Sequence, residues 1–266
     1  MSVLAARLGA ARKENRAALI SYLPVGYPTV EASIEAMVAS AGGGADVVEI
    51  GVPYSDPGMD GPTIQQAVDL AVRAGVGMRD VLRAVEGVAE SGAVPVVMSY
   101  WNPIERYGVD RFARDLAAAG GAGAITPDLI PDEAAEWVAA ADRADLDRVF
   151  LVAPSSTDVR LAMTATACRG FVYAASTMGV TGTRAEVSSV APLLVARVRA
   201  ISGLPVAVGL GVSTGAQAAE VAGYADAVIV GSAFVRALLD ARDPSAGAKA
   251  VQSLAAELAE GVRQLA

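Results

Sequence analysis

The sequence predicts a closed (β/α)8 barrel, the TIM-barrel fold, with an additional helix at its N-terminus. Eight short apolar runs alternate with longer helical patterns along the chain. The runs are rich in Val and Ile and mostly lack polar–apolar alternation, which is typical of parallel strands buried on both faces. The length of 266 residues also suits a barrel of this class. A doubly wound open sheet is the alternative, but eight strands within this length fit a barrel better.

The elements follow in order from these patterns. Residues 1–19 predict an amphipathic helix, because charges occur throughout the segment and it lacks the apolar centre of a signal peptide. The predicted strands are the eight apolar runs Leu19–Pro24, Val47–Gly51, Val94–Tyr100, Ala122–Thr126, Val149–Val152, Gly170–Ala174, Pro205–Gly209 and Ala227–Val230.

The predicted helices between and after these strands cover residues 31–43, 63–75, 78–92, 109–121, 131–143, 157–170, 188–202 and 214–224. Many of these helical patterns end at glycine, which tolerates the left-handed conformation that follows a helix. Neither a charge run nor a Ser/Pro-rich linker divides the chain. We therefore expect one barrel domain over residues 1–266.

Composition excludes several classes of function. Lys plus Arg number 21 against 29 Asp plus Glu, and a net charge of −8 is unfavourable for binding nucleic acid or anionic membranes. The chain has no histidine and a single cysteine, which rules out histidine-based triads, an intrachain disulfide and nearly all zinc, iron or copper sites. Cys168 is expected inside a helix as a small buried hydrophobe. No apolar run approaches the roughly 18 residues needed to span a bilayer, so we expect a cytoplasmic protein.

Carboxylates follow the second predicted strand, at the barrel end where active sites of this fold lie. Glu49 sits among aliphatic residues, which predicts a raised pKa and a role in proton transfer rather than a structural hydrogen bond. Asp60 lies eleven residues further on, where the chain returns toward the barrel. Asp56 precedes a proline, and turn formation is at least as good an explanation for it. Two carboxylates in one pocket can divide acid–base and electrostatic roles.

Tyr173 in the sixth predicted strand is expected either to present its hydroxyl to a ligand or to Glu49, or to be a core aromatic. The segment Ser176–Glu186, rich in glycine and threonine, predicts a mobile lid, with an ordinary exposed loop as the alternative, and Pro53–Pro62 is expected to be a second mobile loop. Glycine turns follow the seventh and eighth predicted strands, where barrels commonly bind phosphate through backbone amides and a helix N-terminus. The phosphate-site candidates are Gly209, Gly211, Gly231 and Ser232.

The segment GADVVEIGVPYSDPGMDGPTIQQA resembles the signature of the tryptophan synthase alpha chain family. The segments PVVMSYWNPIERYG, ITPDLIP, FLVAPSST, FVYAASTMGVTG, GLGVST and VGSAFV follow in that family's order and spacing, so the resemblance covers nearly the whole chain. It implies a (β/α)8 barrel that cleaves indole-3-glycerol phosphate to indole and glyceraldehyde 3-phosphate in tryptophan biosynthesis.

The resemblance also implies residue roles. Glu49 corresponds to the acid–base glutamate, Asp60 to the second essential carboxylate and Tyr173 to the active-site tyrosine. The phosphate contacts correspond to Gly182, Gly211, Gly231 and Ser232, and the lid threonine to Thr181. The indole-pocket positions are Tyr22, Met98, Tyr100, Ile125 and Leu210. The chain departs from the family's common residues at Tyr22, Leu210, Met59, Thr126 and Thr177, and none of these departures removes a catalytic group.

The family reaction is a retro-aldol cleavage, and the composition limits how this chain can perform it. A Schiff base needs a lysine at a strand end, but Lys13 and Lys249 lie in the helical ends of the chain. A metal route typically needs histidine ligands, so carboxylate acid–base chemistry remains. A sugar-phosphate isomerase or epimerase is disfavoured for the same reasons. A non-catalytic partner subunit and a free-standing indole-releasing lyase are the remaining alternatives.

The resemblance implies no cofactor in this chain and a partner β chain that carries pyridoxal phosphate (PLP). The two chains form an α2β2 complex through which indole passes in a tunnel. Asp56 and Pro57, together with the Asn102–Pro103 region, are expected to face that partner.

Overall fold

The computed structural model describes residues 2–175, 190–209 and 211–264. Thr177, Thr181, Gly182, Leu210 and the predicted lid Ser176–Glu186 therefore lie outside the described residues. The strands form one parallel sheet: β1 (Ala18–Pro24), β2 (Val47–Gly51), β3 (Val94–Met98), β4 (Gly123–Ile125), β5 (Asp147–Val149), β6 (Leu151–Val152), β7 (Val172–Ala175), β8 (Val206–Gly209) and β9 (Ala227–Val230).

The sheet closes into a barrel through a single residue. The order of strands is β5-β4-β3-β2-β1-β9-β8-β7-β6, so its two ends, β5 and β6, are consecutive in the chain. Only Phe150 separates them. The run Asp147–Val152 is therefore one barrel strand whose first part pairs with β4 and whose second part pairs with β7. The predicted fold of eight barrel strands is confirmed.

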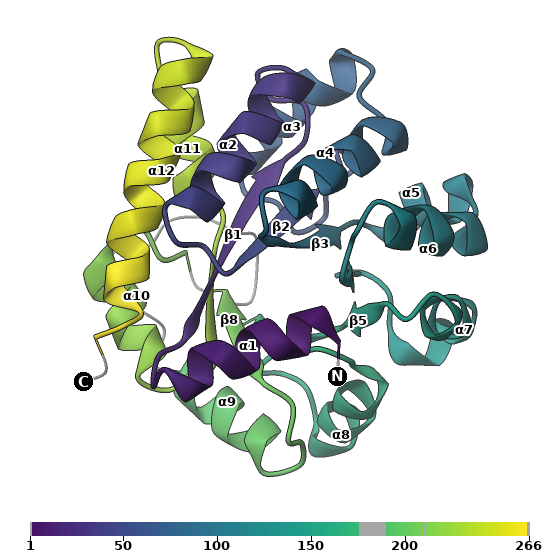
Figure 1. Cartoon of the computed structure of the whole chain (residues 1–266). Helices are drawn as coiled ribbons and strands as arrows, with labels where there is room; N and C mark the ends of the chain where they lie inside the picture. Colours follow the sequence, from purple (N-terminus) through teal and green to yellow (C-terminus); the bar gives the residue numbers. More distant parts are fainter. Residues whose placement is uncertain (1, 176–189, 210, 265–266) are drawn as a thin grey trace.

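Helices surround the strands and connect them in sequence (Figure 1). In chain order the described helices are α1 (Val3–Lys13), α2 (Val30–Gly42), α3 (Pro62–Arg73), α4 (Met78–Glu90), α5 (Trp101–Tyr107), α6 (Val109–Ala118), the 3-10 helix η1 (Pro131–Glu133), α7 (Ala135–Arg143), α8 (Asp158–Ala167), α9 (Ala191–Arg199), α10 (Gly215–Ala222), α11 (Ser232–Leu239) and α12 (Pro244–Gly261). Among the described helices none combines the length and the apolar character that crossing a bilayer requires.

The N-terminal helix covers one end of the barrel. In Figure 1, α1 lies across the strands in front of the barrel. Leu4, Leu8 and Ala11 of α1 are buried in one cluster with lumen residues from the strands, such as Val47 and Val96. Ser2 caps α1 by accepting a hydrogen bond from the amide of Ala5, and its hydroxyl donates to the buried carboxylate of Asp147 at 2.5 Å. The opposite end, where the parallel strands finish, is left for the functional site.

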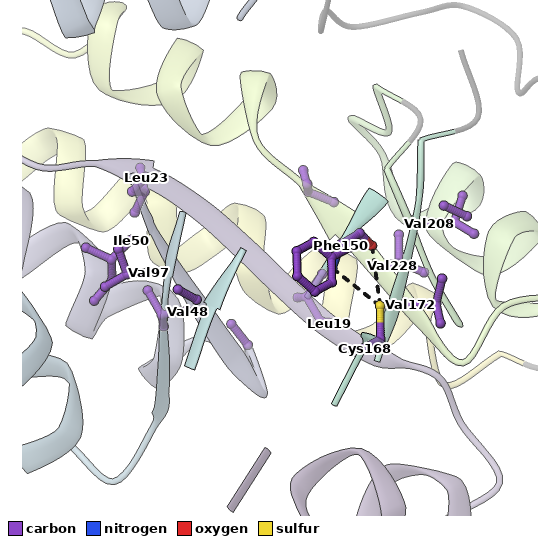
Figure 2. Packing of buried hydrophobic residues seen from close by; sticks show 14 of the residues in the cluster. Leu19, Leu23, Val48, Ile50, Val97, Phe150, Cys168, Val172, Val208 and Val228 are labelled. Carbon is purple, nitrogen blue, oxygen red and sulfur yellow. Dashed lines mark hydrogen bonds between the residues drawn. The ribbon is translucent and has the colours of Figure 1, made fainter. Parts of the chain in front are cut away.

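A second cluster fills the space between the strands and the outer helices. Figure 2 shows part of it, with Phe150 beside Cys168 at the point where the barrel closes. The amide of Phe150 donates to Cys168 Sγ at 3.4 Å. Cys168 is 7% exposed, and burial raises the pKa of its thiol to about 12. The expectation of a small buried residue is confirmed, although Cys168 caps α8 rather than lying inside it.

Several element boundaries differ from the predicted ones. The third predicted strand ran to Tyr100 but β3 ends at Met98, because Tyr100 caps the unpredicted helix α5. The fifth strand begins two residues earlier than predicted, at the polar Asp147, whose carboxylate contacts Ser2 and Arg169. Hydrophobic patterning does not mark this start, because the polar side chain contacts residues distant in the chain.

Candidate active site

A cavity of about 60 Å³ opens at the carboxyl ends of the barrel strands. It is lined by residues of β2, β3, β4, β6, β7 and β8, of the loop before α3 and of the segment after β4: Glu49, Met59, Asp60, Met98, Ile125, Pro127, Leu151, Tyr173, Ala175 and Gly209. The two predicted carboxylates, the predicted tyrosine and two of the predicted indole-pocket residues therefore meet in one place. The remaining lining is largely apolar, so water competes poorly for the two carboxylates.

Glu49 occupies the centre of β2 and points into the lumen. In the sheet register it is the neighbour of Tyr22 on β1 and Val96 on β3. Glu49 is 2% exposed, and its Oε2 atom has no hydrogen-bond partner among the described residues. Burial, followed by the nearby charge of Asp60, raises the pKa of Glu49 to about 8. This carboxyl group therefore carries its proton at neutral pH, and it belongs to the lining of the cavity.

Asp60 lies in the loop just before α3, which starts with Gly61 as its cap and Pro62 as its first residue. The side-chain amide of Gln65, one turn into α3, donates to the carbonyl of Asp60 at 2.7 Å. The carboxylate is buried, which raises the pKa of Asp60 to about 6, while a hydrogen bond from Tyr100 opposes that rise. Asp60 Oδ1 has no partner among the described residues.

Two lumen tyrosines fit against glycines at the ends of neighbouring strands. A Cβ atom on Gly51 would lie 2.6 Å from the hydroxyl of Tyr22, and one on Gly209 would lie 2.6 Å from the hydroxyl of Tyr173. Gly231 also borders the Tyr22 ring, at 3.2 Å from the place its Cβ would occupy. Burial raises the pKa of Tyr22 and of Tyr173 well above 10, so both hydroxyls keep their protons. The glycines thus admit two aromatic rings beside the carboxylates.

The described phosphate-site candidates lie together after the last two strands. Gly209 ends β8 beside Ile229 of β9 in the register. Gly211 has a φ of +70°, the left-handed region that glycine adopts most readily. Gly231 caps α11 and Ser232 is its first residue, so the N-terminus of this helix, where the first amides have no acceptor within the helix, directly follows the end of β9. Gly231 and Ser232 do not line the cavity itself.

Sequence reasoning missed some cavity residues. Leu151 and Ala175 each follow a lumen residue of the same strand by two positions, Val149 and Tyr173, so strand periodicity was a usable signal for both. Pro127 lies beyond β4, where no periodicity applies. Within the described ranges no cluster of three or more His, Cys, Asp or Glu side chains is arranged to hold a metal ion.

Comparison with known proteins agrees with this architecture. The family model described as tryptophan synthase alpha chain matches residues 8–263. A tryptophan synthase alpha chain from Thermobifida fusca is 60% identical over 269 residues, with 100% of both chains covered. One from Mycobacterium avium is 62% identical, covering 98% of this chain and 96% of the relative. The chain belongs to the tryptophan synthase alpha chain family.

Solved structures give the same result. A structure of Mycobacterium tuberculosis tryptophan synthase superimposes with a TM-score of 0.94 at 60% identity, covering 99% of each chain. A tryptophan synthase alpha chain from Legionella pneumophila, at 29% identity, still gives a TM-score of 0.88 over 98% of this chain. As a tryptophan synthase alpha chain, the protein catalyses the cleavage of indole-3-glycerol phosphate to indole and glyceraldehyde 3-phosphate in tryptophan biosynthesis.

Membership of this family also identifies the partner chain and shows which of the two chains carries the cofactor. Tryptophan synthase alpha chains pair with the β chain in α2β2 complexes. PLP belongs to the β chain, and the alpha chain carries no cofactor.

Proposed function

We propose that Glu49 is the proton-transfer group of the cleavage reaction and that Asp60 stabilises the cationic ring. The supporting observation is that the two carboxyl groups share one largely apolar cavity while their pKa values are raised to different extents, to about 8 for Glu49 and about 6 for Asp60. Between these values Glu49 is a protonated acid and Asp60 an anion. That is the division of roles the reaction needs.

The cleavage begins when the carboxylic acid of Glu49 protonates C3 of the indole ring, which makes the ring an indoleninium cation. The carboxylate formed on Glu49 then takes the proton of the glycerol hydroxyl adjacent to the ring. As the aldehyde C=O forms, the bond between the ring and the side chain breaks, and its electrons neutralise the indoleninium. Glu49 ends as it began, protonated, so one residue completes the cycle.

Asp60 acts on the other side of the ring. Asp60 Oδ1 has no hydrogen-bond partner among the described residues. It accepts a hydrogen bond from the ring N–H, which becomes more acidic as the ring becomes cationic. The hydroxyl of Tyr173, held against Gly209, faces the same cavity and contacts the substrate near Glu49. Met98 and Ile125 line the apolar walls that receive the indole ring, with Tyr22 packed beside Glu49 on the neighbouring strand.

The phosphate is held by the amides around Gly211 and at the start of α11, at Gly231 and Ser232. Backbone N–H groups and the helix dipole favour a dianion there without a lysine. Binding energy from this remote group positions the indole against Glu49. The roles that the resemblance implies for Thr181, Gly182 and Leu210 stay proposals, because these residues lie outside the described ranges.

The proposal also covers the contact with the partner chain, the domain organisation and the location of the protein in the cell. Asp56 is exposed, and the loop that carries it lies beside the segment before Asn102, because the rings of Tyr54 and Tyr100 are 5.4 Å apart. The two segments expected to face the β chain therefore lie side by side. One closed sheet supports folding as a single domain over residues 1–266. We place the protein in the cytoplasm, a location that fractionation of cells would test.

Indole release by Glu49→Gln with saturating indole-3-glycerol phosphate tests the assignment. Glutamine keeps the size and polarity of the side chain but cannot shuttle a proton, so we expect kcat to fall about 10²- to 10⁴-fold. Glu90→Gln, an exposed change on α4, is the matched control and should retain full activity. Turnover of Glu49→Gln at the wild-type rate, alone and with the β chain, would refute the role of Glu49.

A further inference from the structure

Tyr100 contacts both ends of the loop that carries Asp60. It follows β3 and caps α5, and it is 4% exposed. Its ring lies against that of Tyr54, with centroids 5.4 Å apart and planes tilted by 34°. Its hydroxyl oxygen accepts the backbone amide of Met59 at 2.9 Å. One side chain from the segment between β3 and α5 therefore holds the loop near its start and again beside Asp60.

The same hydroxyl also interacts with Asp60. The oxygen accepts from the backbone amides of Met59 and Asp60, which leaves the single O–H to donate, and hydrogen bonding by Tyr100 lowers the pKa of the Asp60 carboxyl group. Asp60 Oδ1 is left without a partner among the described residues. An ionised carboxylate with one fixed hydrogen bond has a restricted orientation, since rotating the group would break a charge-assisted bond.

We propose that Tyr100 is a positioning residue that keeps Asp60 Oδ1 turned toward the cavity, where it accepts the ring N–H of the substrate. The sequence suggested only that Tyr100 contributes to the wall of the indole pocket. Its bonds to Met59 and Asp60 give Tyr100 a second role, which is to orient the Asp60 carboxylate. This carboxylate accepts a hydrogen bond from a ring N–H, whereas a ring atom without a proton cannot donate one. This inference rests on the proposed role of Asp60.

Binding of a non-reacting analogue tests the orientation directly. Indole-3-propanol phosphate lacks the hydroxyl that cleavage needs, and its benzofuran counterpart replaces the ring N–H by oxygen with little change of shape. The wild type should prefer the indole compound, because benzofuran leaves Asp60 Oδ1 buried without a donor. In Tyr100→Phe, which keeps the ring, we expect this preference to shrink about tenfold, since the carboxylate is free to turn away.

The turnover rate of Tyr100→Phe and the titration of its Asp60 carboxyl group provide a second test. Tyr100→Phe should lower kcat about ten- to a hundredfold and move the acidic limb of the pH–rate profile to higher pH, because a bond that favours the charged form of Asp60 is lost. Carbon-13 NMR titration of the Asp60 carboxyl, in protein labelled at aspartate, should show the same rise in its pKa. Tyr107→Phe is the matched control: it removes a tyrosine–carboxylate bond to Asp115, at 2.6 Å, at the other end of α5.

The outcomes separate the two proposals. An unchanged Asp60 titration and an unchanged preference for the indole analogue in a folded Tyr100→Phe protein would overturn the positioning role. If Asp60→Asn retains full activity while Tyr100→Phe still shifts the Asp60 titration, the proposed function of Asp60 is wrong and the contact with Tyr100 stands. Thermal unfolding of each variant checks that the fold is intact. An equal effect of Tyr107→Phe would also refute the proposal.

Discussion

Glu49 and Asp60 line the same cavity, and the charge of Asp60 adds to burial in raising the pKa of Glu49. The two groups differ in their surroundings. Glu49 is at the centre of a strand among apolar residues, whereas Asp60 receives a hydrogen bond from Tyr100 that favours its ionised form. As pH rises, Asp60 therefore loses its proton first, and its charge then makes ionisation of Glu49 harder.

The pH dependence of catalysis follows from this order. Below about pH 6 Asp60 is protonated and cannot accept the ring N–H, and above about pH 8 Glu49 is ionised and cannot protonate the ring. We expect kcat/KM to follow a bell with limbs near these values, measured as indole release from about pH 5 to pH 9.5. A rate that rises steadily through pH 9 would show that protonated Glu49 is not required.

Stability should change with pH in the direction opposite to that of an ordinary salt-bridged carboxylate. The pKa of Glu49 is about 8 in the folded chain against a reference value of 4.5, so between these values the folded state binds more protons. The free energy of unfolding therefore falls as pH rises through this window. Glu49→Gln removes this pH-dependent loss of stability, because glutamine does not titrate.

The measurement is urea denaturation of wild type and Glu49→Gln at pH 5, 7 and 9. We expect the variant to become more stable than the wild type as pH rises, by on the order of 4 kcal/mol at most at pH 9. Glu90→Gln should follow the wild type at each pH. A difference between wild type and Glu49→Gln that is constant with pH would mean that Glu49 titrates normally.

A charge at the start of α11 should weaken substrate binding. Ser232→Asp places a carboxylate where we propose that the phosphate binds, so repulsion should raise KM for indole-3-glycerol phosphate about 10- to 100-fold. Ser232→Asn has nearly the same size without the charge and is the control. Equal KM values for the two variants would place the phosphate elsewhere.

Gly209 and Tyr173 should show coupled effects on stability. Gly209→Ala puts a methyl group 2.6 Å from the Tyr173 hydroxyl and 3.2 Å from its nearest ring carbons, which we expect to cost about 1–3 kcal/mol. In a Tyr173→Phe background the closest atom is gone, so the same change should cost about 1 kcal/mol less. Urea denaturation of the four proteins gives the coupling energy, and strictly additive costs would argue against this contact.

Cys168 should matter for stability, because its buried thiol accepts a backbone hydrogen bond. Its Sγ accepts the amide of Phe150 where the sheet closes, so Cys168→Ala leaves that buried amide without its partner. We expect a loss of about 1–3 kcal/mol, with Cys168→Ser, whose hydroxyl is also an acceptor, destabilising less. Thermal or urea unfolding compares the two. If alanine is tolerated as well as serine, the hydrogen bond contributes nothing.

Most of the strands were predictable because their signal is local. Val47–Gly51 and Ala227–Val230 appear in the structure with the predicted bounds, since a buried parallel strand is marked by its own run of apolar residues. The place of Glu49 at the active end of the barrel follows from the same local pattern. The absence of histidine, and of lysine at a strand end, likewise limits the chemistry through amino-acid composition alone.

The sequence by itself thus determined the fold class, the family and the position of Glu49. Only the tertiary structure decided what depends on contacts between distant parts of the chain. Closure at Phe150, the bond from Ser2 to Asp147 and the hold of Tyr100 on Met59 each join residues whose separation in sequence carries no pattern. The physical reason is that periodicity records which face of an element is buried, whereas the partner of a polar group is set by which elements the closed barrel brings together.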